Sequence, residues 1–179
     1  MDNDIQKVLI SAEQIFDRLT ELAEEITNKY RSKPLTIIGL SNGAIVFAAD
    51  LIRQIPIPLH LDTISVSSYR GTESTGKITL EKGLSLCVKN RHVVIVDDIL
   101  DTGLTLSRVS AVVEDAGPLS VSTCVLLNKQ ARRNVDIEAD FCGFDIDDHF
   151  VVGYGLDYNE AYRNLPYIGI LKEKIYGSN

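Results

Sequence analysis

The sequence predicts an α/β fold in which a parallel central sheet is flanked by helices, and three observations lead to this prediction. Short runs of apolar, largely β-branched residues such as Val93–Val96 are typical of strands that are buried on both faces of a sheet. Segments with apolar residues at helical spacing alternate with these runs, and short crossovers between them imply parallel strands. A length of 179 residues and an apolar content of 45% suit one well-packed domain.

The first predicted element is an amphipathic helix over residues 9–30. Ser11 and Gln14 form a capping-box pattern at its start, and apolar residues then recur at helical spacing as far as Ile26. The other expected elements are strands over 35–40, 59–68, 93–96, 120–127, 140–143 and 150–153, a strand pair within 78–88, and helices over 44–55 and from Leu104 to about residue 116.

The stretch from Val93 to Leu106 combines a strand, an acidic pair, a small polar turn and a helix start. Asp97 and Asp98 are expected just after the strand, where their acceptor-only carboxylates suit a sugar diol or a divalent cation. Gly103 lets the backbone approach a ligand closely, and the unpaired N–H groups of the following helix start attract anions. This combination favours a sugar-phosphate site, whereas isolated acidic residues often only end strands and cap helices.

The run Val96-Asp97-Asp98-Ile99-Leu100-Asp101-Thr102-Gly103-Leu104-Thr105 resembles the signature of the phosphoribosyltransferases that use 5-phosphoribosyl-1-pyrophosphate (PRPP), and most closely that of their hypoxanthine-guanine branch. The resemblance extends from about Leu9 to Leu171. It implies a single type I phosphoribosyltransferase domain over residues 1–179. Its expected parts are a core over about 35–143, a mobile loop over about 69–78, and a small hood made from the N-terminal segment and about 144–171.

The resemblance also implies an activity, which is the transfer of the 5-phosphoribosyl group from PRPP to hypoxanthine or guanine with the help of Mg²⁺. Asp97 and Asp98 would then hold the ribose hydroxyls and Mg²⁺, and Asp101 would be the general base or acid near purine N7. Without the resemblance, Asp101 would be taken as a helix cap. The PRPP- and phosphate-binding residues that the resemblance implies are Ser41, Asn42, Gly43, Asp97, Asp98, Asp101, Thr102, Gly103, Leu104, Thr105 and Arg163.

Four residues are expected to bind the purine by the same resemblance. Lys129 would contact O6, Phe150 would stack on the ring, the backbone of Val151 would read the ring edge, and Asp157 would lie nearby and serve a second Mg²⁺. Without the resemblance, a lysine after a strand is usually solvated, and Phe150 would be assigned to the core. The implied metal ligands are Asp97, Asp98 and Asp157, and the implied loop over the site begins at Ser68 and Tyr69.

The chain departs from the family pattern at the turn after the first sheet strand. Family members typically have Leu-Lys-Gly there, with an unusual cis peptide, whereas this chain has Ser41-Asn42-Gly43. If the charge of that lysine matters, affinity for pyrophosphate or a subunit contact should weaken. The loss leaves open a second function, a PRPP-fold regulator that binds nucleotides with little or no catalysis.

A third alternative is a nucleoside triphosphatase, because residues 71–77 match the first seven positions of the Walker A pattern. Ile78 replaces the expected Ser or Thr, and the residues after it alternate like a strand, so we treat this match as chance. The net charge of −7 argues against a nucleic-acid binder, and no apolar run approaches the length of a membrane span. We expect a cytoplasmic homodimer or homotetramer that acts on small molecules, with its three cysteines reduced.

Overall fold

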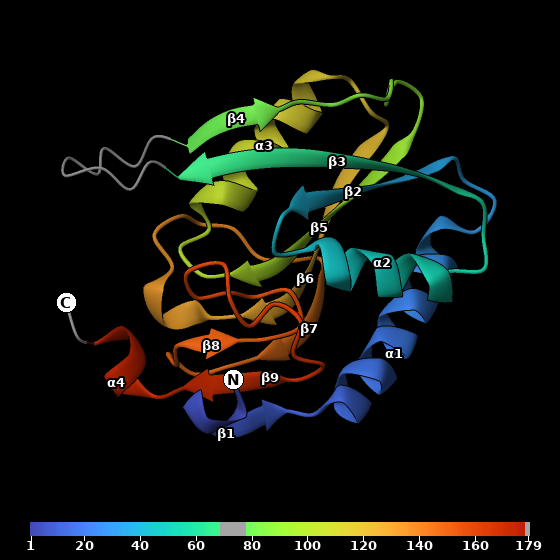
Figure 1. Cartoon of the computed structure of the whole chain (residues 1–179). Coiled ribbons are helices and arrows are strands. Elements are labelled where there is room, and N and C mark those ends of the chain that lie inside the picture. Colours follow the sequence, from blue (N-terminus) through green and yellow to red (C-terminus); the bar gives the residue numbers. More distant parts are fainter. Residues whose placement is uncertain (69–77, 178–179) are drawn as a thin grey trace.

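The computed structural model describes residues 1–68 and 78–177, and its larger sheet is mostly parallel (Figure 1). In this part of the chain the sheet has six strands, in the order β4 (Ile78–Lys82), β3 (Leu59–Ser68), β2 (Leu35–Ser41), β5 (His92–Leu100), β6 (Ser120–Asn128) and β7 (Phe141–Asp145). Neighbouring strands are parallel except β4, which runs antiparallel to β3 at one edge. The predicted fold class is confirmed.

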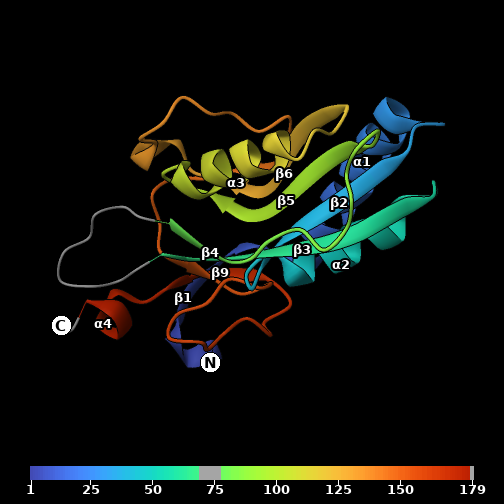
Figure 2. The ribbon, with the colours of Figure 1, turned by 90° about the horizontal axis from the view of Figure 1, so that it is seen from above.

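Helices cover both faces of this sheet. Helices α1 (Ala12–Tyr30) and α2 (Ile45–Gln54) lie on one face and α3 (Leu104–Asp115) on the other. Figure 2 shows α2 and α3 on opposite sides of the sheet. The capping box of α1 is confirmed, since the N–H of Gln14 donates to Ser11 Oγ and the N–H of Ser11 donates to Gln14 Oε1. None of the helices in the described residues is long and apolar enough to span a membrane.

A smaller antiparallel sheet joins the two ends of the chain and forms the hood of the predicted fold class. Its strands lie in the order β1 (Ile5–Ile10), β9 (Ile168–Leu171) and β8 (Val151–Val152). Ile10, Val151 and Ile168 belong to the same buried cluster as the apolar face of α1, so this sheet shares a core with the larger one. The other elements are the 3₁₀ turns η1 (Asp2–Asp4) and η2 (Gln130–Arg132) and the short helix α4 (Glu173–Tyr176).

Strands β2 and β5 lie side by side at the point where the strand order reverses. The chain leaves β2 through α2 toward β3 on one side, and it leaves β5 through α3 toward β6 on the other. The pairing of β5 with β2 ends at Val96, whereas its pairing with β6 continues to Leu100. The carboxyl ends of two diverging strands are the usual place for a ligand in open α/β sheets.

Several predicted bounds need correction. Asp97 and Asp98 lie inside β5 and not after it, because β6 continues to supply hydrogen-bond partners beyond Val96. The prediction of a strand pair within residues 78–88 is wrong, since β4 is the strand formed there and it pairs with β3. The first helix begins at Ala12 and not at residue 9, because the preceding residues form β1, which was not predicted.

Candidate active site

A cavity of about 780 Å³ opens at the carboxyl ends of β2 and β5. Segments that are far apart in the sequence contribute to its walls: the turn after β2, parts of β3 and β4, the stretch from Asp97 to Leu106, and part of the tail beyond β8. The predicted residues that line it are Ser41, Asn42, Gly43, Asp97, Asp98, Asp101, Thr102, Gly103, Thr105, Asp157 and Arg163. The structure therefore brings together most of the residues that were expected to bind PRPP.

The turn after β2 packs directly on the acidic pair. The peptide bond between Ser41 and Asn42 is cis. A Cβ atom on Gly43 would lie 1.7 Å from Asp98 Oδ2, and one on Gly155 would lie 2.2 Å from the carbonyl oxygen of Gly43. A side chain at either position would collide with a neighbour, because the turn is in close contact on one side with a carboxylate and on the other with the tail backbone.

Asp97 and Asp98 form a buried acidic pair on the floor of the cavity. Asp97 is 7% exposed, its Oδ1 accepts the N–H of Asp98 at 3.0 Å, and Asp98 Oδ1 accepts the N–H of Ile99 at 2.9 Å. Burial raises the pKa of both carboxyl groups, and the charge of Asp98 raises the pKa of Asp97 further. The positive charge of Arg163 opposes this shift at Asp98. Such a pair is stabilised by any cation that reaches it.

The loop from Asp101 to Thr105 leads from β5 into α3. Gly103 has a φ of 83° and is the N-cap residue of α3. The N–H of Leu104 donates to Thr102 Oγ1 at 3.4 Å. The first N–H groups of a helix lack partners within the helix and attract anions, so this end of α3 suits an anion. Thr102 and Thr105 line the cavity beside them. Asp101 Oδ1 is buried and has no hydrogen-bond partner among the described residues. Asp101 therefore does not cap the helix, which was the ordinary structural role considered for it.

Arg133 and Asn134, which follow the η2 turn, hold this loop in place by hydrogen bonds to its backbone. The Nε of Arg133 donates to the carbonyl oxygen of Asp101 at 3.0 Å, and its Nη2 donates to that of Leu100 at 3.3 Å. The N–H of Asn134 donates to the carbonyl oxygen of Thr102 at 2.9 Å. Arg133 could not be predicted as part of the site, because nothing in its sequence neighbourhood indicates that it contacts residues about thirty positions earlier.

The tail contributes a cation to the opposite wall. One nitrogen of Arg163, Nη2, lies 2.8 Å from Asp157 Oδ1 and 3.2 Å from Glu160 Oε2, and Nη1 donates to the carbonyl oxygen of Gly155 at 2.8 Å. Arg163 and Asp157 both line the cavity, as predicted. Sequence reasoning did not assign the other polar side chains that line it, which are Ser65, Glu81, Asn159 and Glu160.

Of the four residues expected to bind the purine, Asp157 lines this cavity, whereas Lys129, Phe150 and Val151 do not. Lys129 is 5% exposed and its Nζ lies 2.9 Å from Asp148 Oδ1. The ring of Phe150 is 37% exposed and stacks on Tyr176 with a centroid distance of 4.6 Å. Val151 begins β8 and is buried. Lys129 nevertheless adjoins the site, since its N–H donates to the carbonyl oxygen of Leu100 at 2.9 Å.

Three other expectations have different outcomes. Leu104 is 38% exposed and does not line the cavity, because it is the first residue of α3 and its side chain points outward. Ser68 is the last residue of β3, and Tyr69 lies outside the described residues together with the Walker-like run 71–77. Ile78 begins a strand and not a helix, so the triphosphatase alternative is wrong in its structural context.

Comparison with known proteins identifies the family. Residues 8–159 match the family model described as a phosphoribosyl transferase domain. The chain belongs to the phosphoribosyltransferase family. The shared region includes both the turn after β2 and the loop before α3.

Individual relatives of this phosphoribosyltransferase agree with that assignment. It is 44% identical over 179 residues to a hypoxanthine-guanine phosphoribosyltransferase of Staphylococcus aureus, covering 99% of this chain and 100% of that protein. It is 46% identical over 177 residues to the bifunctional protein TilS/HprT of Listeria monocytogenes, covering 98% of this chain but only 27% of that protein's length. A crystal structure of a Staphylococcus aureus hypoxanthine phosphoribosyltransferase has a TM-score of 0.95 at 45% identity, covering 100% of this chain and 97% of that one.

The acidic residues of this phosphoribosyltransferase suit a hard divalent cation. Mg²⁺ is usually bound by one or two carboxylates together with water and substrate phosphates. Asp97 and Asp98 are adjacent, and each pKa is raised by burial, so a cation there would relieve an unfavourable charge. No group of three or more Asp, Glu, His or Cys residues in the described ranges could hold a metal ion alone. The donors thus fit a metal that shares its coordination with a substrate.

Proposed function

We propose that this chain transfers the 5-phosphoribosyl group from PRPP to hypoxanthine or guanine, which gives IMP or GMP and pyrophosphate. The observation that carries the proposal is that a backbone turn, an acidic pair and the N-terminus of a helix meet in one cavity. These three parts match the diphosphate, the sugar and the 5-phosphate of PRPP. The full-length similarity to the Staphylococcus aureus enzyme supports the choice of 6-oxopurine substrates.

In this proposal PRPP is bound along the cavity floor. The backbone N–H groups at the start of α3 and the hydroxyls of Thr102 and Thr105 hold the 5-phosphate. Asp97 and Asp98 accept hydrogen bonds from the ribose hydroxyls. The turn at 41–43 presents its backbone to the pyrophosphate, and Arg163 offers a positive charge from the opposite wall.

The reaction breaks the bond from ribose C1 to pyrophosphate oxygen and forms the bond from C1 to purine N9. Because the transition state has oxocarbenium character, the protein contributes mainly by orienting the partners and stabilising the charge on the leaving group. When the incoming purine carries its proton on N7, the Asp101 carboxylate accepts that proton as N9 attacks. The buried and unpartnered Oδ1 of Asp101 suits this role, because a purine N–H would satisfy it.

Mg²⁺ enters this proposal as a cofactor that neutralises charge on the diphosphate. Asp97, Asp98 and Asp157 are the residues that would hold it, together with oxygens of the substrate. Asp157 is paired with Arg163 in the structure, so its carboxylate would be shared between that cation and the metal.

The purine would extend from Asp101 toward Lys129. A lysine ammonium can only donate hydrogen bonds. It therefore pairs with the O6 carbonyl of hypoxanthine or guanine, which is an acceptor, and not with the amino group of adenine, which is a donor. Phe150 would stack on the ring and the backbone of Val151 would read its edge. As part of the same proposal, the enzyme acts in the cytoplasm as a homodimer or homotetramer. Sedimentation of the purified protein measures the number of subunits.

The experiment that tests this proposal is a PRPP- and Mg²⁺-dependent ultraviolet assay with hypoxanthine, guanine, xanthine and adenine in parallel. We expect turnover of hypoxanthine or guanine, with adenine inert. If all four bases are inert while PRPP or a nucleotide still binds by calorimetry, the enzyme proposal is overturned in favour of the regulator. The first variant to test would then be Asn42→Lys, which restores the lysine that is usual in the family.

A further inference from the structure

Lys129 is an almost completely buried cation with a carboxylate partner. Its side chain is 7% exposed, and its Nζ lies 2.9 Å from Asp148 Oδ1. Burying an ammonium group is costly unless an opposite charge accompanies it. In the described part of the chain, Asp148 is the acidic residue within ion-pair distance of Lys129. Asp148 therefore offsets the cost of burying this lysine and limits the directions in which its ammonium group can point.

The carboxylate of Asp148 is itself fixed from two sides. Its Oδ1 faces Lys129, and its Oδ2 accepts from the Nε of Arg132 at 2.9 Å. Hydrogen bonds from Lys129 and Arg132 lower the pKa of the Asp148 carboxyl. With each oxygen engaged by a different donor, the carboxylate has little freedom to rotate, and the ammonium that it holds is oriented accordingly.

Asp148 also connects the two segments that are expected to hold the purine. Lys129 follows β6, whereas Asp148 lies two positions before Phe150, on the turn between β7 and β8. Two further contacts join these segments: the N–H of Ile146 donates to the carbonyl oxygen of Asn128 at 2.9 Å, and Nδ2 of Asn128 donates to Asp145 Oδ1 at 2.7 Å. The distance between the lysine and the aromatic ring thus depends on contacts made by this turn.

We propose that Asp148 is a positioning residue for purine selection. It holds the Lys129 ammonium at the height of a purine ring that is stacked on Phe150. One of the three N–H donors of the ammonium is engaged by Asp148, and the other two remain for acceptors such as O6. A fixed ammonium discriminates against adenine, which presents an amino group at the same position. The inference deepens the proposed function and rests on it.

The test is the steady-state kinetics of Asp148→Ala with hypoxanthine, guanine, adenine and PRPP. We expect the KM for hypoxanthine and guanine to rise about tenfold, with kcat and the KM for PRPP changed by less than about twofold, because the lost interaction contributes to base binding alone. The preference for hypoxanthine over adenine should narrow by a similar factor. Asp148→Glu, which keeps the charge, should restore part of the lost affinity.

Asp147→Ala is the matched control, since Asp147 is the neighbouring exposed carboxylate and its side chain has no ion pair within the described residues. It should leave all constants near those of the wild type. A KM for hypoxanthine that is unchanged or lowered by Asp148→Ala, or a KM for PRPP that rises in parallel, overturns the inference. A wild-type chain that is inert with every base would instead overturn the proposed function itself.

Discussion

Asp101 shows how a residue's chemistry depends on groups that hold it in place. Its backbone carbonyl accepts from Arg133, and its Oδ1 is left buried and unpartnered at the edge of the cavity. The ten-residue signature led to the prediction of an acid–base role for Asp101, which stays a prediction, whereas its contact with Arg133 could not be predicted from the sequence. Likewise, the predicted contact of Lys129 with the purine stays a prediction, and the sequence could not indicate its pairing with Asp148, which depends on how β6 and the turn after β7 pack together.

Asp101→Asn should lower kcat by a factor of about 10² to 10⁴, which is the usual contribution of general acid–base catalysis. The amide has nearly the same shape but cannot accept a proton, so binding of PRPP should remain close to that of the wild type. Steady-state assays give kcat, and calorimetry with PRPP and Mg²⁺ gives the affinity. Asp115→Asn, at the far end of α3, is the control and should behave like the wild type. Unchanged turnover in Asp101→Asn would refute the acid–base role.

At the scale of elements, prediction succeeded where the pattern is local. The capping box located α1, and the apolar runs located β2, β3 and β6 to within two residues. It failed where an element depends on a distant partner. Strand β1 was missed because it pairs with β9 at the other end of the chain, and β5 is longer than its apolar run because β6 pairs with it as far as Leu100.

The turn between β2 and α2 gives a prediction at this scale. A Cβ atom on Gly43 would overlap the Asp98 carboxylate, and Gly43 has an ordinary negative φ, so alanine should displace that carboxylate without straining the backbone. We expect Gly43→Ala to raise the KM for PRPP more than about tenfold while the unfolding midpoint in urea changes little.

Gly83→Ala is the matched control for this turn. A Cβ atom there would be 3.5 Å from a Leu80 methyl group, which is an ordinary contact. Gly83→Ala should therefore keep the KM for PRPP of the wild type. Equal effects of the two substitutions on that KM would argue against a specific contact between the turn and the acidic pair.

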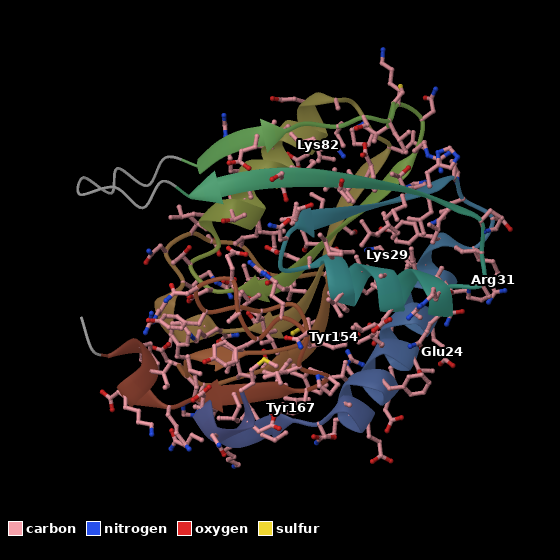
Figure 3. The ribbon with its side chains drawn as sticks, in the orientation of Figure 1. Glu24, Lys29, Arg31, Lys82, Tyr154 and Tyr167 are labelled. Carbon is pink, nitrogen blue, oxygen red and sulfur yellow. The ribbon has the colours of Figure 1, made fainter. Side chains whose placement is uncertain are left out.

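At the scale of the whole molecule, hydrogen bonds from tyrosines join the C-terminal part of the chain to the rest. Tyr154 donates to Asp50 on α2 at 2.6 Å, Tyr162 to Asp4 at 3.1 Å and Tyr167 to Asp2 at 2.9 Å (Figure 3 labels Tyr154 and Tyr167). The sequence could not indicate these pairs, because each joins residues more than a hundred positions apart. The bonds of Tyr162 and Tyr167 join the tail to the turn before β1, and the bond of Tyr154 joins the tail to α2, which packs on the larger sheet.

These pairs predict that the protein loses stability at alkaline pH. Burial and the bond to Asp50 raise the pKa of Tyr154, and the pKa values of Tyr162 and Tyr167 are raised as well. Above the unfolded tyrosine pKa of about 10 the unfolded chain releases these protons while the folded chain keeps them, so the free energy of unfolding falls as pH rises. Below that pH the contribution is fully present.

Tyr154→Phe isolates the largest of these effects. At pH 7 it should lower the free energy of unfolding by about 1.5–3 kcal/mol, the value of a hydrogen bond to a charged group. Above about pH 10 the free energy of unfolding should fall less steeply with pH than in the wild type, because the variant lacks the Tyr154 hydroxyl, whose pKa is raised by folding. Urea unfolding followed by circular dichroism between pH 7 and 11 measures both quantities. Tyr158→Phe is the control, because the hydroxyl of Tyr158 makes no hydrogen bond within the described residues. Equal slopes in Tyr154→Phe and the wild type would show that the bond from Tyr154 to Asp50 on α2 does not link the stability of the protein to the titration of Tyr154.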